Sequence, residues 1–332
     1  MNVPLRVLAV TNLWPVNGGF RGVFVQEQVA ALRRLGHEVD VEVVAQARGK
    51  ADYLLAAPRV RKRAKSASYD LVHVHYGLTA LASRFVGHLP RVLSLYGSDV
   101  NVAWQRMAAG LGAGAVAARV YPSRRLAEAA GDPTGHVVPN GVDYGLFQPP
   151  DDREVVRASF GIAPGEPVVL FGALPGNAVK GYDVYSDVLA ELRDRGVPAR
   201  ELVLAEADQP RSRVVAKFAA ADVLLVTSRK GTESGPLIVK EAAAMGLPVV
   251  SVDVGDVAEV LTGVTPSTVV SFPEPWGTAA TRTALITRLA DEVAAVLSAG
   301  QRSDGRARTA RYDERTVTHQ LVAVYREVLA RH

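Results

Sequence analysis

The sequence predicts an α/β protein made of two doubly wound domains, each with its own parallel sheet. The length of 332 residues suits two domains better than one. Short apolar, β-branched runs alternate with longer segments of helical spacing, and this alternation stops once, at the proline- and acid-rich residues 147–152, before it restarts. Because strands that alternate with helices need crossover connections, we expect parallel sheets covered on both faces.

The first half of the chain contains six strand candidates. They are residues 7–10, 39–44, 71–75, 92–96, 120–121 and 137–138. Residues 23–35 are expected to form a helix, since their apolar side chains recur at three- and four-residue steps. We expect this N-terminal domain to span residues 1–148.

The second half repeats the pattern after the proline-rich break. Its strand candidates are residues 168–171, 202–205, 223–227, 249–252 and 269–272, and its helix candidates are residues 182–195, 214–220, 237–245, 281–297 and 316–330. We expect a second domain at 149–315 and a C-terminal helix at 316–332 that packs back on the first domain. Because open parallel sheets bind ligands beyond the carboxyl ends of their strands, we expect the two domains to face each other across a ligand-binding cleft.

The composition limits which cellular compartments and which kinds of site are expected for this chain. There is no cysteine, which excludes disulfides and thiolate metal sites. The N-terminus is expected to form a buried strand rather than a signal peptide, and no apolar run is long enough to span a bilayer. We therefore expect a soluble, cytoplasmic protein.

The charge is distributed unevenly along the chain. Residues 1–150 hold 17 Lys and Arg against 10 Asp and Glu, a net +7, and the rest hold 21 against 24, a net −3. Much of the excess lies in the run from Arg59 to Lys65. This run is either an ordinary solvated helix face or a patch for anionic lipid or a phosphorylated acceptor, which would place the protein at the inner face of the membrane. Nucleic acid is not expected, because no aromatic residues are interleaved to stack on bases.

The most informative segment, residues 228–241, follows a strand and leads into a helix. Pro236 stands where the first helical residue is expected, and the free N–H groups of such a helix start form a phosphate site. Glu233 and Glu241 lie eight residues apart, one at the helix mouth and the other about one turn inside. One carboxylate can then accept hydrogen bonds from sugar hydroxyls while the other reaches a ribose diol. An ordinary capped helix, with Glu241 exposed or ion-paired, is the alternative.

This segment resembles the Glu-x7-Glu motif of glycosyltransferase family 4. Four further segments are similar to that family in the same order, namely residues 18–22, 36–39, 70–75 and 138–143. The resemblance implies the GT-B fold, two Rossmann-like domains, a nucleotide-diphosphate sugar donor and a retained anomeric configuration. It also implies that neither a metal nor another cofactor is required.

The resemblance assigns roles to individual residues. Glu241 is expected to bind the ribose, Glu233 the transferred sugar and Lys180 the diphosphate. The full set expected to bind the donor is Gly19, Gly22, Lys180, Ser228, Glu233, Ser234, Gly235, Pro236 and Glu241. The residues expected to act in catalysis are Glu233, Lys180 and Tyr96, and the candidates on the acceptor side are Tyr76, Asp99 and Arg124.

Two positions depart from the family pattern. Ala173 stands where an arginine against the diphosphate is expected, and because a desolvated diphosphate needs compensating charge, Lys230, Arg229 or Arg21 are the candidates to supply it. Tyr96 stands where the family often has histidine. Two alternatives are open for it: a role near the anomeric carbon, or a purely structural role in which its ring packs beneath the cleft.

Three further polar residues are singled out by their positions in the sequence. Asp99 either holds an acceptor hydroxyl or caps the next helix. His73 and His75 are expected to face opposite sides of their strand, one packed in the core and the other near the cleft.

Rival functions remain open at this level. A dinucleotide oxidoreductase would need G-x-G-x-x-G directly after a strand, and the first loop differs. A nucleotide-sugar epimerase of similar fold and a non-catalytic sugar-nucleotide-binding protein share the expected donor site. The acceptor is a glycan, a lipid-linked sugar or a small molecule, and the sequence does not distinguish them.

Overall fold

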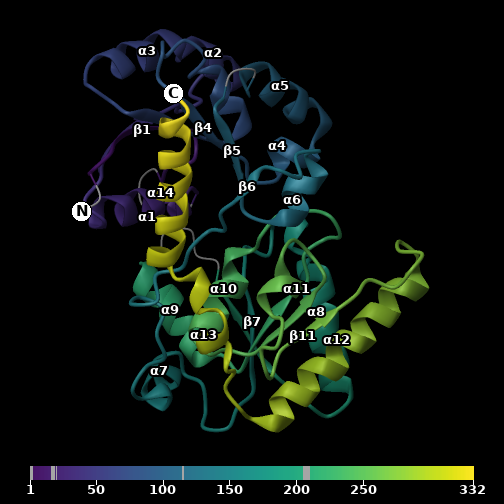
Figure 1. The fold of residues 1–332 in the computed structure, drawn as a ribbon. Coiled ribbons are helices and arrows are strands. Elements are labelled where there is room, and N and C mark those ends of the chain that lie inside the picture. The colour runs from purple at the N-terminus through teal and green to yellow at the C-terminus, as the bar shows by residue number, and fades with distance from the viewer. Residues whose placement is uncertain (1–2, 16–18, 20, 114–115, 205–209) are drawn as a thin grey trace. The chain divides into compact units, whose positions relative to one another are not determined.

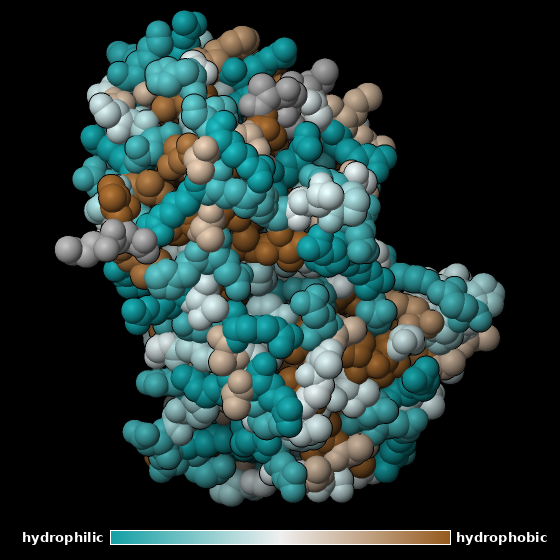
Figure 2. Space-filling model, viewed as in Figure 1, coloured by the Kyte–Doolittle hydropathy of each residue, from teal (hydrophilic) through white to brown (hydrophobic). Residues whose placement is uncertain are grey.

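The computed structural model describes residues 3–15, 19, 21–113, 116–204 and 210–332. The chain divides into two compact units, Met1–Gly141 with Glu314–His332 (unit 1) and Val142–Asp313 (unit 2). Each unit is a parallel sheet with helices packed on it (Figure 1). Among the described residues, none of the helices combines the length and the apolar character needed to cross a bilayer. On the face seen in Figure 2, hydrophilic residues predominate and hydrophobic residues form smaller areas.

The sheet of unit 1 has the strand order β2-β1-β3-β4-β5-β6, and all its pairs are parallel. Its strands are β1 (Arg6–Thr11), β2 (Glu38–Val43), β3 (Leu71–His75), β4 (Arg91–Ser94), β5 (Ala118–Tyr121) and β6 (His136–Val137). The chain moves outward from β1 to β2 and then returns to place β3 on the other side of β1. The loops after β1 and β3 therefore lie at the position where open α/β sheets bind ligands.

The helical elements of unit 1 are α1 (Val23–Arg34), η1 (Gly49–Ala51), α2 (Asp52–Leu55), α3 (Ala57–Lys65), η2 (Gly77–Leu81), α4 (Ser98–Asn101), α5 (Ala103–Ala113), α6 (Arg124–Ala129) and α14 (Glu314–Ala330). The C-terminal helix α14 lies beside α1 in Figure 1. Its buried Leu321 and Tyr325 share a hydrophobic cluster with Val29 and Leu32 of α1. The last helix of the chain is thus part of the core of the first unit.

The sheet of unit 2 has the order β11-β10-β9-β7-β8, again with parallel pairs. Its strands are β7 (Val168–Phe171), β8 (Arg200–Val203), β9 (Val223–Val226), β10 (Val249–Val252) and β11 (Thr268–Val270). Its helical elements are α7 (Arg153–Ser159), η3 (Ala178–Lys180), α8 (Tyr182–Asp194), α9 (Arg211–Ala220), α10 (Leu237–Ala244), α11 (Val257–Val260), α12 (Ala279–Ala299), α13 (Gly305–Arg308) and η4 (Ala310–Tyr312). Every residue of β7, β9 and β10 is buried, as expected for strands covered on both faces.

The predicted elements agree closely with these bounds. The strands expected at 71–75, 168–171 and 249–252 have those bounds, and the others shift by a few residues at their ends. The strand expected at 92–96 ends at Ser94, so Tyr96 lies in the loop that follows β4. The strand expected at 202–205 ends at Val203, and Ala205 lies outside the described residues.

The boundary between the units lies before the proline-rich stretch and not within it. Val142 forms a parallel bridge with Asp313 and donates its N–H to the carbonyl of Tyr312 at 2.9 Å. Phe147 is buried in the core of unit 2. The expected limits at residues 148 and 315 therefore move to 141 and 313, because these long-range contacts tie residues 142–152 to the second unit.

Candidate functional site

Three of the expected donor-site residues meet in unit 2, where the loop after β9 approaches the start of α8. The Glu233 carboxylate accepts a hydrogen bond from Lys180 Nζ at 2.6 Å and another from Ser228 Oγ at 2.8 Å. Lys180 retains 28% of its side-chain exposure and Glu233 12%. This Lys180–Glu233–Ser228 cluster is thus partly buried, and its lysine remains accessible to a bound anion.

The backbone around Gly181 explains why Lys180 reaches this position. Gly181 has φ +67°, and a Cβ there would lie 2.1 Å from the carbonyl oxygen of Thr227. The Thr227 hydroxyl donates to the carbonyl of Gly181 at 2.9 Å. Only glycine allows this approach, which fixes the β7–α8 loop against the end of β9.

Glu241 lies inside α10 and is almost fully buried. Its carboxylate accepts a hydrogen bond at 2.5 Å from the guanidinium of Arg211, the first residue of α9, whose side chain keeps 32% exposure. The Arg211 guanidinium also stacks on the Phe147 ring, 4.8 Å from its centre. Sequence reasoning missed Arg211. The available signal was its position just beyond β8, on the sheet edge where the other candidates lie.

The segment from Ser234 to Pro236 leads directly into α10. Pro236 is the N-cap and the helix begins at Leu237, one residue later than expected, because the backbone of Pro236 is extended. Asp256 lies against Gly235, with its carboxylate oxygens 3.2–3.4 Å from where a Cβ would stand. Asp256 also accepts a hydrogen bond from Lys240 at 2.6 Å, and both side chains are buried. This internal ion pair supports the loop that was expected to hold sugar and phosphate.

The cations expected to compensate for Ala173 have partners elsewhere. Arg229 pairs with Asp183 at 2.7 Å and Lys230 with Glu274, both at exposed positions. Arg21 donates to Gln46 at 3.4 Å. Arg211 is therefore the additional cation that directly contacts an expected donor-site carboxylate.

In unit 1, the glycine loop ends at Gly22, the N-cap of α1. Gly22 has φ +82°, and a Cβ would lie 2.3 Å from the carbonyl carbon of Leu13, so the turn requires glycine. Gly19 has no regular secondary structure, and Gly18 and Phe20 lie outside the described residues.

Tyr96 is hydrogen-bonded to a histidine. Its hydroxyl lies 2.7 Å from Nδ1 of His75, and its ring meets Phe24 edge-on with centroids 4.9 Å apart. Burial lowers the pKa of His75 from 6.5 to about 3, so its ring is neutral. Burial also raises the pKa of Tyr96, so this phenol stays protonated at neutral pH.

The expectation that His73 and His75 face opposite sides of their strand is wrong. Residues two apart on a strand share a face, and the two rings lie 4.0 Å apart between centroids. His73 is hydrogen-bonded to Ser94 at 2.8 Å and, through Nδ1, to Tyr325 of α14 at 2.6 Å. Both histidines are buried, and burial holds the pKa of His73 well below its usual value.

Asp99 does not cap the helix that follows it, and its expected role on the acceptor side stays a prediction. It is buried, and its two oxygens accept hydrogen bonds from the backbone N–H groups of Gly77, Tyr96 and Gly97 at 2.8–3.2 Å. It therefore ties the loop after β3 to the loop after β4. Burial raises the pKa of its carboxyl group, although these N–H groups act in the opposite direction.

The two other acceptor-side candidates are more accessible. Tyr76 has φ +79°, an uncommon conformation for a residue with a side chain, and its hydroxyl donates to Gln105 at 2.5 Å. Arg124 lies in the first turn of α6 and donates to the carbonyl of Pro133 at 2.7 Å. The expected catalytic and acceptor-side residues of unit 1 thus gather after β3 and β4, except Arg124, which follows β5, while Gly19 and Gly22 follow β1.

Two protein families match parts of this chain. Residues 203–291 match the family described as Glycosyl transferases group 1, and residues 22–111 match the family described as Glycosyl transferase 4-like. The two matched segments together make up just over half of the chain.

Curated proteins with similar sequences are also named as glycosyltransferases. The chain is 31% identical over 230 residues to the D-inositol 3-phosphate glycosyltransferase of Segniliparus rotundus, covering 58% of this chain and 47% of that protein. It is 29% identical over 239 residues to the enzyme of that name from Nocardia farcinica, covering 56% and 52%. The chain therefore spans about half the length of the curated relatives that it matches.

Solved structures match over nearly the whole chain. Sucrose-phosphate synthase from Thermosynechococcus elongatus has a TM-score of 0.75 at 15% identity, covering 98% of this chain and all of that one. HepE of Anabaena, solved with UDP, has a TM-score of 0.66 at 18% identity, covering 97% of this chain and all of that one. At these identities the likeness concerns the fold alone. Taken together, the matched families, the relatives and the two parallel-sheet units show that this chain belongs to the group 1 glycosyltransferases of the GT-B fold.

Proposed function

We propose that this chain transfers a sugar from a nucleotide-diphosphate sugar to an acceptor, retaining the anomeric configuration and requiring no metal. The observation that carries the proposal is the Lys180–Glu233–Ser228 cluster at the carboxyl end of β9, with Glu241 inside the helix that follows. A cation and two carboxylates at this edge suit a ligand that has both phosphates and hydroxyls. Because the chain spans only about half of its curated relatives, the activity of the whole protein is part of the proposal.

The ion pair between Lys180 and Glu233 suggests how the donor is accommodated. On binding, the lysine exchanges the carboxylate for the diphosphate oxygens, and Glu233 becomes free to accept hydrogen bonds from the sugar hydroxyls. Such an exchange needs little reorganisation, since both groups are already partly buried and held by the protein. Preorganised charge of this kind stabilises the negative charge that develops on the leaving group.

We propose the following course for the transfer itself. The bond between the anomeric carbon and the diphosphate oxygen breaks, and the acceptor oxygen forms its bond on the same face. The acceptor proton passes to the departing phosphate oxygen, so no separate general base is required. Tyr96 stays protonated because burial raises its pKa, and we propose that it donates a hydrogen bond near the anomeric centre.

Glu241 and Arg211 complete the proposed donor site. Glu241 binds the ribose hydroxyls, and Arg211 orients its carboxylate. Arg211 also supplies positive charge that the site lacks at Ala173. Its 32% side-chain exposure supports this role, because a guanidinium that is partly open to solvent is able to reach a phosphate.

The donor and the acceptor remain to be identified. HepE has been solved with UDP and with UDP-glucose, which makes a uridine diphosphate sugar the first donor to try. We propose a glycan, a lipid-linked sugar or a small molecule as the acceptor.

Thermal melting with UDP, GDP, ADP and TDP tests the donor site. One nucleotide should raise the melting temperature of the wild-type protein, and Glu241→Ala should abolish that shift. Incubation of the matching nucleotide sugar with acceptor candidates then tests transfer, since a transferase releases nucleotide only when the acceptor is present. Nucleotide binding without acceptor-dependent release would indicate an epimerase or a non-catalytic binding protein, and no shift with any nucleotide would contradict the proposed donor site.

A further inference from the structure

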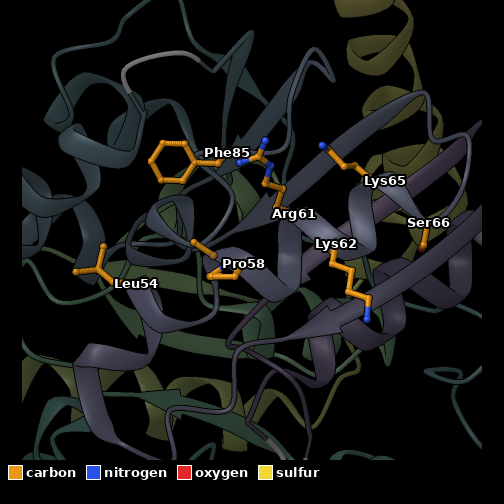
Figure 3. Close-up of a pocket in the computed structure, with 8 residues that line it drawn as sticks. Leu54, Pro58, Arg61, Lys62, Lys65, Ser66 and Phe85 are labelled. Atoms are coloured by element: carbon orange, nitrogen blue, oxygen red, sulfur yellow. The ribbon is translucent and has the colours of Figure 1, made fainter.

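A groove on unit 1 combines exposed apolar side chains with cations. It has a volume of about 770 Å³ and is lined by residues of α2, α3 and the segment after η2, namely Leu54, Ala57, Pro58, Arg61, Lys62, Lys65, Ser66 and Phe85. In the view of Figure 3, Leu54 and Phe85 lie to the left of Pro58, and Lys62, Lys65 and Ser66 lie to its right. None of these residues belongs to the proposed donor site.

The structure divides the basic run of α3 into two sets. Arg59 pairs with Glu42, and Arg63 pairs with Asp40 at 3.3 Å, so both are directed to strand β2. Arg61, Lys62 and Lys65 line the groove instead, and within the described part of the chain they have no carboxylate partner within 4 Å. The helical repeat explains the division, because positions 58, 61, 62 and 65 share one face.

The apolar residues of the groove are unusually open to solvent. Leu54 is 63% exposed and Phe85 57%, and the adjacent Leu55 is 56% exposed. Single exposed apolar residues are common on proteins, but a group of large ones beside unpaired cations marks a surface that binds a partner. Since the sequence has no acidic residue between Asp52 and Asp70, or from there to Asp99, the charge of these segments is positive throughout.

We propose that this groove and its rim lie on an anionic lipid bilayer. Leu54, Leu55 and Phe85 enter the interfacial region, while Arg61, Lys62 and Lys65 contact the lipid phosphates. The combination of apolar residues with cations on long, flexible stems is what interfacial membrane binding requires. This proposal goes beyond the transfer reaction and does not depend on it.

Flotation of the full chain with vesicles tests the proposal. We expect binding to phosphatidylcholine vesicles that contain one third phosphatidylglycerol, weakened by high salt, and much weaker binding to pure phosphatidylcholine. Arg61→Gln with Lys65→Gln should reduce binding by about 20-fold or more, since each cation near an anionic surface contributes roughly a factor of five. The matched control is Arg59→Gln with Arg63→Gln, which changes the net charge equally on the same helix and should have a clearly smaller effect.

A second pair of variants tests the apolar part. Leu54→Ser should weaken vesicle binding several-fold, whereas Val155→Ser on α7 of unit 2, where Val155 is similarly exposed at 65%, should leave it unchanged. Nucleotide-dependent melting shifts, recorded on the same variants, show whether the fold and the donor site are intact and so keep this test separate from that of the transfer activity.

Three results would overturn the membrane proposal. The first is no flotation with anionic vesicles at low salt. The second is an equal loss of vesicle binding in the Arg61/Lys65 and the Arg59/Arg63 double variants. The third is a single-stranded oligonucleotide that binds as tightly as the vesicles do and whose binding is weakened by the same substitutions. The last result would assign the surface to nucleic acid.

Discussion

The first strand-to-helix connection of unit 1 and that of unit 2 have the same backbone turn, but the cation in each turn has a different partner. In both, the helix begins at a glycine in the left-handed conformation, Gly22 before α1 and Gly181 before α8. In both, the residue before that glycine is a cation. Among the residues that the structure describes, Arg21 in unit 1 donates to the side-chain oxygen of Gln46 at an exposed position, whereas Lys180 in unit 2 is held by the Glu233 carboxylate.

The difference arises from the backbone that each glycine approaches. A Cβ at Gly22 would meet Leu13, which belongs to the same loop, whereas a Cβ at Gly181 would meet Thr227 at the end of a different strand, β9. That neighbouring strand end also carries Ser228 and Glu233. The turn at Gly181 therefore forms part of a charged cluster because the segment after the adjacent strand β9 supplies the Glu233 carboxylate.

Replacement of the two cations tests the comparison most strongly. Lys180→Met should lower kcat by about 10²- to 10³-fold, as for other preorganised groups that stabilise a leaving anion. Arg21→Met should cost less than about tenfold, because its partner is a neutral amide at an exposed site. Steady-state rates with the donor found by melting check both values, and equal losses would break the distinction between the units.

Replacement of the two glycines should instead have equal effects. Gly22→Ala and Gly181→Ala should each destabilise their own unit by about 3 kcal/mol, through left-handed strain and steric overlap with backbone. Gly36→Ala and Gly165→Ala separate these causes, since both have positive φ and open space, and should cost only about 1 kcal/mol. Hydrogen exchange of peptides from each unit measures the two effects, and a clash variant no worse than its open control would refute the packing argument.

Loss of the Glu241 carboxylate, the second of the Glu-x7-Glu motif, should lower the affinity for the donor nucleotide. Glu241→Gln should weaken nucleotide binding about 10- to 100-fold, the value of one or two hydrogen bonds to a charged group. Arg211→Gln should show a smaller loss in the same direction, because it removes the group that orients Glu241. Calorimetric titration measures both, and the exposed Glu259→Gln is the control. An unchanged dissociation constant in Glu241→Gln would remove this residue from the site.

Mild acid, between about pH 6.5 and 5, should destabilise unit 1 more than unit 2. All seven histidines lie in unit 1. His75 has a folded pKa of about 3 against an ordinary 6.5, so between these values the unfolded chain binds the additional proton. The stability that this neutral histidine contributes is complete above pH 6.5 and falls as the pH decreases towards 3, by about 1.4 kcal/mol per pH unit.

Urea unfolding measures this dependence in variants that keep only Trp104 of unit 1 or only Trp276 of unit 2. His75→Gln should flatten the slope of unit 1, and exposed His88→Gln should not. An identical pH dependence in the two units would contradict the assignment to the buried histidines.

Much of the fold could be predicted because its signals are local. Strands such as β7 and β10 are continuous apolar runs, and α1 shows its period within twelve residues. The resemblance to the family also predicts Lys180, Ser228, Glu233 and Glu241 as site residues, and the first three are hydrogen-bonded together in the structure.

One error was local, because His73 and His75, two residues apart on a strand, share a face. The other corrections concern contacts between segments. The run at 147–152 has the composition of a linker, but Phe147 is buried in unit 2. Asp99 stands where a helix cap is expected, yet it accepts hydrogen bonds from backbone N–H groups of two loops. Composition and spacing describe a residue's own segment and contain no information about its partners.

Local sequence patterns predict the two parallel α/β domains and each strand to within a few residues. The tertiary structure alone decided that Lys180 meets Glu233, that Arg211 meets Glu241 and that His75 holds Tyr96. It also decided which cations of α3 are paired and which line a groove. The physical reason is that periodicity follows from local backbone geometry, whereas ion pairs depend on which strands become neighbours, as β7 and β9 do here.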